Sequence, residues 1–434
     1  MIITIIIARL VEKILRLFGR GATTFPGKIA LALNKNILKQ LSENVKIIII
    51  TGTNGKTTTA RIVEEGLKTA GKSYFLNRSG ANLITGITTS FLMNCKINGK
   101  CKYEYAVVEC DENALRKVSL YLDADILAVT NIFRDQLDRY GEVSHTLEAI
   151  KAGAQNMKNA VLVLNADDPL SFSLSSLNKK YYTFGINLSL SLGGRSDSDY
   201  CIFCKSPYKY KSRIYSQLGD FYCTGCGYKR ESPNLSVEEI IELKSDYSKV
   251  FANLNGKNAI LKINLGGAYN IYNALCASAV LSVAGLTKDE IETAVSSFSG
   301  AFGRMEQFGD IRILLVKNPT GLTQAVDYIY RLDFDNVVFV LNDNEADGCD
   351  VSWIWDADIK INPNVKHIYT FGIRSGDMAL RLKYAGLNPE IIKSHSQFHN
   401  ICKSGKTAVV PTYTAMMKLR PYFAKLYKKE RFWK

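Results

Sequence analysis

The sequence of 434 residues has no apolar segment long enough to cross a membrane, which takes about 20 residues. No small-residue cleavage site follows its apolar N-terminus, so the pattern of a secretory signal peptide is also missing. Apolar residues make up 47% of the chain, which gives ample core for about two to four globular domains. We therefore expect a folded cytoplasmic protein rather than a channel, a transporter or a secreted chain.

Acidic residues are in the minority, with 41 Asp and Glu against 55 Lys and Arg, which gives a net charge of +14. Such a balance implies an anionic partner, and a nucleotide, a phospholipid surface, a pyrophosphate-bearing substrate and a nucleic acid all fit it. The ten cysteines, in a chain that looks intracellular, favour metal binding or free thiols over disulfides.

Residues 1–44 are predicted to form an amphipathic helix and a connection to the next unit. Arg9, Glu12, Lys13 and Arg16 lie on one side of this helix. The apolar residues at helical spacing on the other side are Ile7, Leu10, Val11, Ile14, Leu15, Leu17 and Phe18. Two interpretations stay open: the helix packs on its own protein, or it lies on a membrane surface.

A nucleotide-binding pattern begins at residue 45. The apolar run 45–51 predicts a fully buried parallel strand, and a helix is expected from Lys56 to a stop at Gly71. Between them lies a glycine-containing loop, whose N–H groups, with the helix N-terminus, point at the phosphates of a nucleoside triphosphate. Lys56 is expected to reach the β- and γ-phosphates, and Thr57 to ligate Mg²⁺. The residues predicted to bind ATP here are Gly52, Thr53, Asn54, Gly55, Lys56, Thr57 and Thr58.

Five further strands, with helical patterns between them, predict a central α/β domain over residues 45–308 with a mostly parallel sheet. They are expected at Ser73–Leu76, Tyr105–Val108, Ile126–Thr130, Val161–Leu164 and Tyr181–Phe184. In such sheets the chemistry lies beyond the carboxyl ends of the strands, where Thr51, Glu109 and Asn131 stand. Glu109 is therefore a candidate to share Mg²⁺ with Thr57, although an ordinary surface carboxylate would also explain it.

Four cysteines interrupt this domain in an insertion expected at about 198–230. They form two Cys-x2-Cys pairs with 18 residues between them, which is typical of a tetrahedral Cys₄ zinc ribbon. Four thiolates leave no coordination position open, so the zinc is expected to be structural. The predicted ligands are Cys201, Cys204, Cys223 and Cys226.

A C-terminal α/β unit, expected to be Rossmann-like, is predicted over residues 309–434. Its strands are expected at Ile311–Lys317, Val337–Leu341, Ile368–Phe371 and Thr407–Val410. An acidic loop with Trp353 and Trp355 follows the second of these strands, and this combination favours a surface at which a partner docks. The alternative is that the tryptophans belong to the core and the acids cap the next helix.

The segment from Gly52 to Thr57, Gly-Thr-Asn-Gly-Lys-Thr, resembles the Mur ligase superfamily, which builds the peptidoglycan stem peptide, and folate polyglutamate synthases share it. The resemblance implies that Asn270 and Asn273 lie near the adenine and that Arg304, in Gly-Arg-Met-Glu, approaches the phosphates.

The segment that begins at Asn131 is also similar to the family, but Gln136 replaces a histidine that helps to bind a metal in many members. Lys151 falls where many Mur ligases carry a carbamylated lysine.

Three departures from ordinary Mur ligases are similar to the MurT family, the Mur-ligase-like subunits of lipid II isoglutaminyl synthase. They are the Cys₄ insertion, Asn318-Pro-Thr-Gly, and the segment from Asp347 to Asp356. The resemblance covers nearly the whole chain and adds Asn318 to the expected nucleotide site. It implies amidation of the α-carboxyl of D-isoglutamate in the lipid II stem peptide through an acyl phosphate, with ATP, Mg²⁺ and Zn²⁺ bound.

The resemblance also implies two partners: a GatD-like glutaminase that supplies ammonia, and lipid II at the inner face of the membrane, without nucleic acid. One acidic residue of the C-terminal domain is implied to complete the glutaminase's Cys-His-Asp triad. Asp350 is the candidate, with Asp347 and Asp356 as alternatives. No arrangement typical of a glutaminase is found among this chain's own cysteines and histidines, so the ammonia is expected to come from another chain.

Two other classes of function stay open. An amino-acid-adding ligase of the Mur or folylpolyglutamate type would need a pocket for the incoming amino acid and no glutaminase. A non-enzymatic zinc protein could bind nucleic acid through its basic surface, but an intact phosphate loop with Glu109 and Arg304 argues against it.

Overall fold

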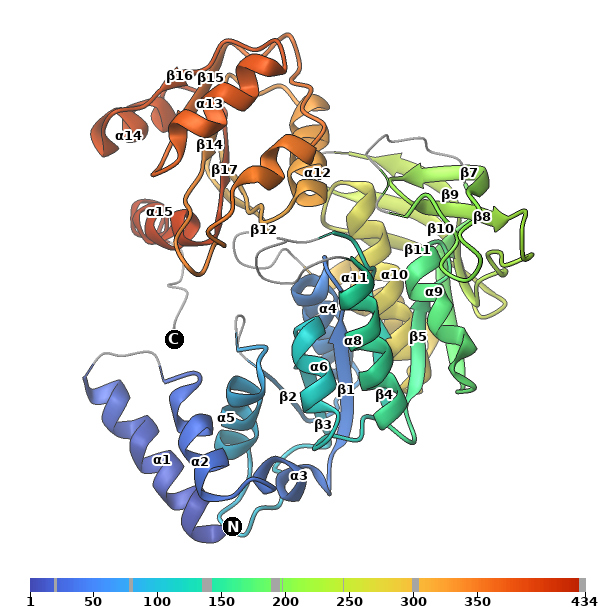
Figure 1. Ribbon diagram of the computed structural model, residues 1–434. Coiled ribbons are helices and arrows are strands. Elements are labelled where there is room, and N and C mark those ends of the chain that lie inside the picture. Colours follow the sequence, from blue (N-terminus) through green and yellow to red (C-terminus); the bar gives the residue numbers. More distant parts are fainter. Residues whose placement is uncertain are drawn as a thin grey trace.

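The computed structural model describes residues 1–18, 22–77, 81–134, 143–188, 196, 198–244, 246–298 and 304–428, with the backbone alone at 304 and 305. These residues form two α/β units, each built on its own sheet, and a small two-stranded ribbon (Figure 1). The helices of the first unit are α1 (Ile2–Leu17), α2 (Phe25–Leu33), α3 (Ile37–Ser42), α4 (Lys56–Thr69), α5 (Ile84–Asn94), α6 (Glu112–Val118), α8 (Val143–Asn156), α9 (Pro169–Phe172), α10 (Ala268–Val283) and α11 (Lys288–Ser297), with a 3₁₀ turn η1 (Ser173–Leu177).

The larger sheet contains, among the described residues, nine strands in the order β11-β10-β9-β6-β5-β4-β1-β3-β2. The strands from β9 to β2 are parallel to their neighbours, while β10 and β11 add an antiparallel edge. This confirms the mostly parallel α/β sheet that the alternation of strands and helices predicts. The strands are β1 (Lys46–Thr51), β2 (Tyr74–Leu76), β3 (Tyr105–Glu109), β4 (Ile126–Val129), β5 (Val161–Asn165), β6 (Tyr181–Ile186), β9 (Leu235–Leu243), β10 (Ser248–Leu254) and β11 (Lys257–Ile263).

Both faces of strand β1 are buried, which is why its sequence is a run of isoleucines rather than an alternation of apolar and polar residues. Ile48 and Ile50 belong to the core that includes residues of α4, α10 and α11. Ile47 and Ile49 belong to the opposite core, with residues of α5, α6 and α8. The helices that pack on the two faces therefore fix the position of β1 in the fold, and with it the position of the loop at its carboxyl end.

The cysteine insertion leaves the larger sheet after β6 and returns to it at β9. It forms an antiparallel ribbon of β7 (Tyr208–Tyr215) and β8 (Leu218–Cys223), whose cysteine end packs in a small core with Phe172 of α9. Gln217, at the tip of the ribbon, donates a hydrogen bond of 2.7 Å from Nε2 to the carbonyl oxygen of Ile132, just after β4. Arg230 pairs at 2.6 Å with the buried carboxylate of Asp167. The hydrogen bond of Gln217 and the ion pair of Arg230 thus attach the ribbon to the larger unit.

The second unit is built on a sheet whose six strands, within the described ranges, have the order β12-β13-β17-β14-β15-β16. All neighbours are parallel except β12, which pairs antiparallel with β13. Its elements are β12 (Arg304–Phe308), β13 (Ile311–Leu314), α12 (Pro319–Tyr330), β14 (Asn336–Val340), η2 (Ser352–Asp356), β15 (His367–Phe371), α13 (Ser375–Tyr384), β16 (Glu390–Ile391), α14 (His395–Lys403), β17 (Thr407–Pro411) and α15 (Tyr413–Leu426).

Strand β12 lies on the other side of the predicted boundary after residue 308. A turn at Gly309 lets β12 fold back on β13, so both strands belong to the C-terminal sheet. The change from one sheet to the other therefore comes before Arg304. The strand predicted to run to Lys317 ends at Leu314, because Asn318 already caps helix α12.

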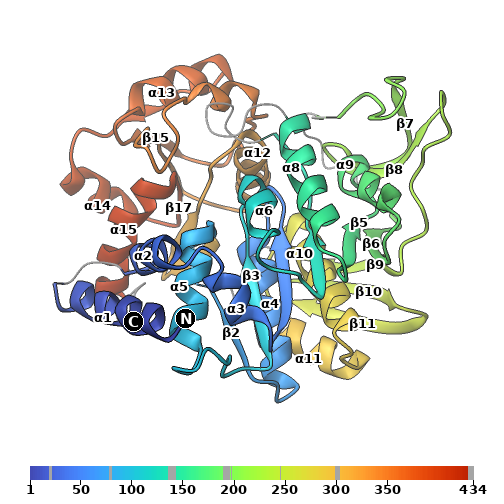
Figure 2. The ribbon, with the colours of Figure 1, turned by 60° about the horizontal axis from the view of Figure 1, so that its bottom comes forward.

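Helix α1 packs on its own protein, as one of the two open interpretations predicts, but with one side only. Ile5 and Ala8 are fully buried, and the guanidinium of Arg9 donates hydrogen bonds to the carbonyl oxygens of Leu92 and Cys95 at the end of α5. In both views α1 lies at one edge of the molecule, beside α2 (Figure 1 and Figure 2). Among the helices that the structure describes, none combines the length and the apolar character needed to cross a membrane.

A buried ion pair joins the two ends of the C-terminal unit. The guanidinium of Arg420 in α15 makes two bonds, of 2.8 and 2.9 Å, to the carboxylate of Glu306 in β12. Removal of one partner from a buried ion pair typically costs about 3–5 kcal/mol. We therefore expect Arg420→Ala to lower the unfolding temperature of this unit by several degrees in calorimetry. Lys418→Ala, at an exposed position of the same helix, is the control. Equal unfolding temperatures for both variants would contradict a stabilising role for the pair.

Candidate nucleotide site

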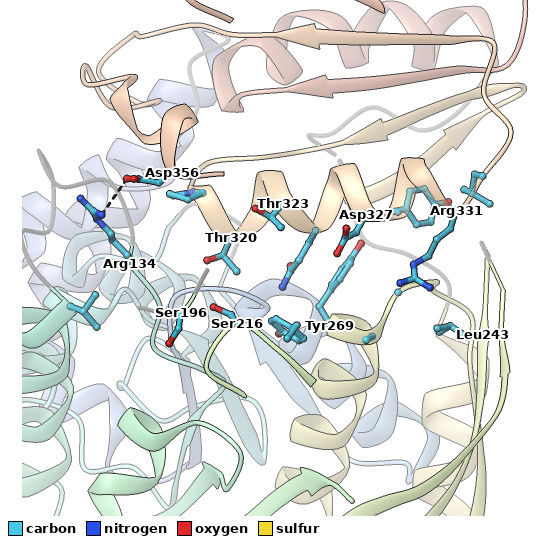
Figure 3. A pocket seen from close by; sticks show the side chains of 18 of the residues that line it. Arg134, Ser196, Ser216, Leu243, Tyr269, Thr320, Thr323, Asp327, Arg331 and Asp356 are labelled. Carbon is cyan, nitrogen blue, oxygen red and sulfur yellow. Dashed lines mark ion pairs between the residues drawn. The ribbon is translucent and has the colours of Figure 1, made fainter. Parts of the chain in front are cut away.

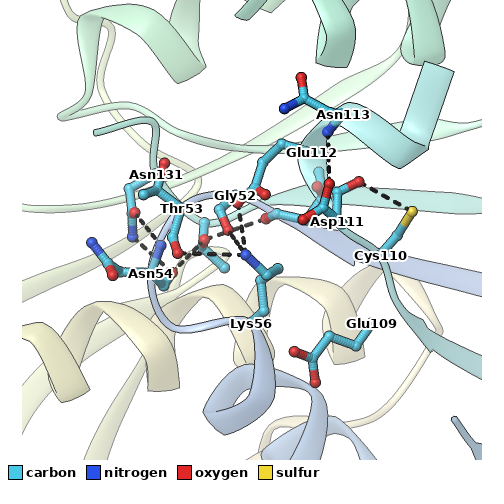
Figure 4. Close-up of polar contacts among 12 residues, drawn as sticks. Gly52, Thr53, Asn54, Lys56, Glu109, Cys110, Asp111, Glu112, Asn113 and Asn131 are labelled. Carbon is cyan, nitrogen blue, oxygen red and sulfur yellow. Dashed lines mark hydrogen bonds and ion pairs between the residues drawn. The ribbon is translucent and has the colours of Figure 1, made fainter. Parts of the chain in front are cut away.

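The predicted phosphate loop connects β1 to α4 at the carboxyl edge of the larger sheet (Figure 4). Gly52 and Gly55 have φ angles of 120° and 87°, which residues with a Cβ rarely adopt. A Cβ at Gly55 would lie 2.0 Å from Oδ1 of Asn273, and one at Gly52 would lie 2.3 Å from Oγ1 of Thr130. Both glycines are therefore required by the close approach of neighbouring elements as well as by the turn.

Lys56 is buried at the first position of α4. Its Nζ donates hydrogen bonds to the carbonyl oxygen of Gly52 at 2.6 Å and to Oε1 of Glu112 at 2.7 Å. Burial by itself lowers the pKa of this ammonium group, but the charges of Glu112, Asp111 and Glu109 outweigh it and raise the pKa above the ordinary value. Lys56 is therefore a permanent positive charge at the bottom of the loop.

Thr57, in the first turn of α4, lies beside Glu109, the last residue of β3. The hydroxyl of Thr57 lies 3.0 Å from each carboxylate oxygen of Glu109. Asn77, after β2, accepts from the backbone N–H of Glu109 and donates to its carbonyl oxygen, at 2.7 and 2.8 Å, and so fixes the backbone of this residue. A hydroxyl and a carboxylate beside a phosphate loop are oxygen ligands that fit Mg²⁺.

Asn131 shapes the loop from the neighbouring strand β4. Its carbonyl oxygen accepts from the N–H of Thr53 at 2.9 Å, and its Oδ1 accepts from the N–H of Asn54 at 3.0 Å (Figure 4). The hydroxyl of Thr53 in turn donates to the carbonyl oxygen of Phe133. These bonds hold the loop in a defined conformation. They come from Asn131 and the segment after it, at the strand end that the sequence analysis singled out.

The C-terminal unit reaches the phosphate loop through Asn318. Its Nδ2 donates a hydrogen bond of 3.1 Å to Oδ1 of Asn54, while its own Oδ1 caps α12 by accepting from Gly321. Asn318 is completely buried, so this contact lies inside the boundary between the units. The expected nucleotide residue is thus placed beside the loop by the cap of a helix.

The two asparagines of α10 also lie at the loop. Asn273 donates from Nδ2 to Oδ1 of Asn270 at 3.1 Å, and Asn270 donates to the carbonyl oxygen of Gly266. Together with Gly55 and Thr58 they line a small cavity of about 90 Å³ between α10, the loop and α12. The structure therefore brings the predicted residues Asn54, Gly55, Thr58, Asn270 and Asn273 together.

A larger cleft of about 420 Å³ continues from this cavity between the two units (Figure 3). The two spaces share Tyr215 of the ribbon, Tyr269 and Gln324. At the far end of the cleft, Arg134 forms an ion pair of 3.2 Å with Asp356. The cleft thus has aromatic and polar walls from three parts of the chain: the larger sheet, the ribbon and α12.

Some residues expected at the site are placed elsewhere or not described. Gln136 lies outside the described residues, and of Arg304 only the backbone is described, as the first residue of β12. Lys151 lies on α8 with a partly exposed side chain and pairs with Glu148 at 3.5 Å.

The four predicted cysteine ligands form one cluster, with all their Sγ atoms within 4.8 Å of one another. The Sγ atoms of Cys201 and Cys226 are 3.6 Å apart, and those of Cys204 and Cys223 are 3.4 Å apart, with no disulfide between them. A tetrahedral site with metal–sulfur bonds of about 2.3 Å places sulfurs about 3.8 Å apart, so the cluster fits one metal ion. The hydrogen bonds of Ser206 lower the pKa of the Cys204 thiol to about 6, whereas at Cys226 a backbone hydrogen bond of Tyr228 is outweighed by burial and the three neighbouring thiols, which raise the pKa to about 12.

The acidic loop after β14 holds residues with different surroundings. Asp347 is buried and accepts from the backbone N–H and the hydroxyl of Thr414, so it fixes the start of α15. Asp350 is half-buried and accepts from the N–H and Oγ of Ser352 at 2.7 and 2.8 Å. Trp353 is part of the core, as the alternative interpretation predicts, whereas Trp355 is exposed and packs edge-on against Tyr384.

Glu112 is the site residue that the sequence interpretation left without a role. It is the first residue of helix α6, which follows the end of β3 at Glu109. Asp111 caps that helix by accepting from two backbone N–H groups. Its bond to Lys56 joins residues 56 positions apart. The only signal in the sequence is a third carboxylate directly after Glu109 and Asp111.

Comparisons with known proteins agree with this geometry. The model of the Mur ligase middle domain matches residues 50–200, and that of the MurT ligase C-terminal domain matches residues 315–416. A protein of Streptococcus pneumoniae (strain ATCC BAA-255 / R6) named lipid II isoglutaminyl synthase (glutamine-hydrolyzing) subunit MurT is 35% identical, over 95% of this chain and 94% of its own. Its namesake in Staphylococcus aureus (strain COL) is 33% identical, over 94% of each chain.

Solved structures show the same fold at lower identity. A pseudomurein peptide ligase type C from Methanothermus fervidus has a TM-score of 0.67 at 20% identity, covering 90% of this chain and 81% of that one. A MurF ligase from Thermotoga maritima in complex with ADP has a TM-score of 0.60 at 13% identity, covering 94% and 84%. These likenesses confirm the predicted Mur ligase fold.

Proposed function

Because this chain belongs to the MurT family of Mur-ligase-like subunits, we propose that it is the ligase subunit of a lipid II isoglutaminyl synthase. It converts the α-carboxyl of D-isoglutamate in the lipid II stem peptide to the amide, with ATP as the source of energy. The observation that carries this proposal is the charged, buried Lys56 beside the Thr57–Glu109 pair in a chain related to MurT proteins over nearly its whole length. The lipid-linked substrate puts the reaction at the inner face of the membrane.

The chemistry requires activation, because a carboxylate is a poor acylating agent. A carboxylate oxygen attacks the γ-phosphorus of ATP, ADP leaves, and an acyl phosphate forms. The lone pair of ammonia then attacks the acyl carbon, inorganic phosphate leaves with the C–O bonding electrons, and the nitrogen loses a proton. The first step moves negative charge over the phosphate oxygens, so the site must offer fixed positive charge there.

The residues of this chain supply that environment. Lys56 provides a permanent positive charge, and its ammonium group is oriented by hydrogen bonds to Gly52 and Glu112. Thr57 and Glu109 would hold Mg²⁺, which when bound neutralises charge on the β- and γ-phosphates. Asn131 fixes the conformation of the loop by accepting hydrogen bonds from the N–H groups of Thr53 and Asn54. The adjoining cavity with Asn270 and Asn273 accommodates the nucleoside end, and Asn318 ties the C-terminal unit to the loop.

Ammonia is proposed to come from a GatD-type glutaminase bound to this chain. Asp350 is the residue proposed to complete the partner's triad, since Asp347 is committed to Thr414 and Asp356 pairs with Arg134 across the cleft. The exposed Trp355 lies in the same loop region and offers an aromatic contact for the partner.

The metal of the cysteine cluster is proposed to be zinc with a purely structural role. Four thiolates saturate a tetrahedral ion, so no position is left for substrate. The tip of the ribbon carries Gln217 to the segment after β4, whose Phe133 carbonyl accepts from Thr53 of the phosphate loop. The metal therefore stabilises the ribbon, and the ribbon supports the loop.

The ATP assignment is tested by Lys56→Ala. This change removes the cation aimed at the phosphoryl group, so we expect amidation of lipid II with ATP and ammonium to fall by about 100-fold or more. Lys68→Ala, an exposed lysine on the same helix, is the matched control and should keep full activity. Circular dichroism verifies that both variants are folded.

Two results of this assay would contradict the proposal. Turnover of the folded Lys56→Ala variant close to that of the unchanged chain would refute the role of the phosphate loop. Incorporation of an added amino acid in place of ammonia would instead support an amino-acid-adding ligase.

The metal assignment predicts about one zinc ion per purified chain in elemental analysis. Cys201→Ser should reduce the zinc content and the unfolding temperature together, because it removes one of four ligands. Cys349→Ser changes an exposed cysteine outside the cluster and should alter neither. Native protein that carries no zinc, or a Cys201→Ser variant with full zinc content, would show that the cluster is not a zinc site.

The partner assignment predicts a selective effect of Asp350→Asn. The asparagine keeps an oxygen for the N–H of Ser352 and an amide group for its Oγ, so the loop retains its conformation. Amidation driven by glutamine in the complex should fall by about 100-fold or more, because a neutral group does not orient a catalytic histidine as a carboxylate does. Amidation driven by ammonium should stay unchanged.

Glu345→Gln, an exposed acid of the same loop, is the control for this experiment. If Asp350→Asn lowers both activities equally, or neither, Asp350 does not belong to the partner's triad.

A further inference from the structure

Helix α1 has two apolar sides, and only one of them is used inside the molecule. The buried side is centred on Ile5 and Ala8. The opposite side carries large apolar residues spaced three or four positions apart, which on a helix form a single stripe. We call this stripe the outer face of α1; its residues are Ile3, Ile6, Leu10, Ile14 and Leu17, all exposed.

The outer face is a fixed feature of the surface and not the result of a loosely attached helix. The guanidinium of Arg9 binds the carbonyl oxygens of Leu92 and Cys95, and α1 packs against both α2 and α5. With Ile5 and Ala8 locked into the core, the stripe must point away from the protein. Leu10 remains 56% exposed and Leu17 85%. Exposed apolar stripes of this length mark an interaction surface.

The charge around the helix indicates the kind of partner. Residues 1–44 contain seven Lys and Arg against two Asp and Glu, a net charge of +5. Lys13 and Arg16 on α1 and Lys28 on α2 are exposed. An apolar stripe bordered by lysine and arginine is the pattern of helices that lie in the interface of an anionic bilayer.

The composition of the stripe favours lipid over protein. It consists of isoleucine and leucine without tryptophan or tyrosine, whereas strong protein–protein contacts are enriched in Trp, Tyr and Arg and poor in Leu. A bilayer needs no shape complementarity, so a row of aliphatic side chains suffices. The choice of a membrane also rests on the proposed function, since a lipid-linked substrate has to be met at a bilayer.

We propose that the outer face of α1 lies in the interface of an anionic phospholipid bilayer and seats the enzyme on the membrane surface. The aliphatic side chains enter the boundary between headgroups and acyl chains, while the lysine and arginine side chains contact lipid phosphates. The helix lies in the membrane plane and does not cross the bilayer.

A flotation experiment with the full chain tests this proposal. Vesicles of phosphatidylcholine with about one third phosphatidylglycerol are expected to carry the protein to the top of a density gradient, and vesicles of phosphatidylcholine alone should carry much less. The double variant Leu10→Glu/Leu17→Glu should lower the partition coefficient by about tenfold or more, because two apolar contacts become charged. Both positions are exposed, so the fold is not at risk. Leu380→Glu, at an exposed apolar position on α13, is the matched control.

Three outcomes would overturn the proposal: absence of flotation with anionic vesicles, equal flotation of the double variant, or equal loss with the Leu380→Glu control. A dimer in light scattering that the double variant dissociates would assign the outer face to a second copy. Failure of the double variant to bind the glutaminase would assign it to that partner.

The vesicles contain no lipid II, so their binding is independent of amidation. Flotation without amidation would refute the proposed function alone. Amidation of detergent-dispersed lipid II without flotation would refute only the proposed binding of α1 to the membrane.

Discussion

A positive charge buried at the carboxyl edge of the larger sheet is the constraint to which the rest of the nucleotide site conforms. Removing an ammonium group from water is costly unless anionic groups surround it. Lys56 meets this requirement through Glu112, and the charges of Asp111 and Glu109 add to it. The helix α6 therefore has to begin where its first residue reaches Lys56. The ammonium group donates to the carbonyl oxygens of Gly52 and Thr53 as well as to Glu112, so its position in the loop is fixed.

This constraint reaches beyond the loop, because the elements that hold it are themselves held. Asn131 shapes the loop, and the segment that follows Asn131 accepts the hydrogen bond of Gln217 from the ribbon. The cysteine end of the ribbon packs only in a small core shared with Phe172 of α9, whereas Ile214, Tyr215 and Leu218 at its other end belong to the core of the larger unit. The proposed metal would therefore act on the phosphate loop only through the ribbon and this short series of contacts.

The sequence predicts those features whose causes are local. The phosphate loop, the glycines in it and the two cysteine pairs follow from residues close together in the chain, and the structure brings each group together. Glu112 and Gln217 escaped prediction since their partners, Lys56 and Ile132, are 56 and 85 positions away. Strand β12 was not expected from the sequence for the same reason: its pairing with β13 depends on a turn at Gly309 rather than on its own pattern. The tryptophans were treated as a pair, but only Trp355 is exposed, because η2 turns Trp353 into the core.

The boundary between the two units is the place where the proposed nucleotide would bind. The polar contacts across it include the Asn318–Asn54 hydrogen bond, the Arg134–Asp356 ion pair and a polar contact between the side chains of Tyr215 and Gln324. Both side chains of that ion pair are about one third exposed, and pairs of this kind contribute roughly 0–1 kcal/mol. The cleft between these contacts is a cavity of about 420 Å³ and not a packed interface. A nucleotide that spanned the loop and the cleft would add contacts to both units. Asn318 already contacts the phosphate loop through Asn54, so such a nucleotide would stabilise an arrangement that the two units adopt by themselves.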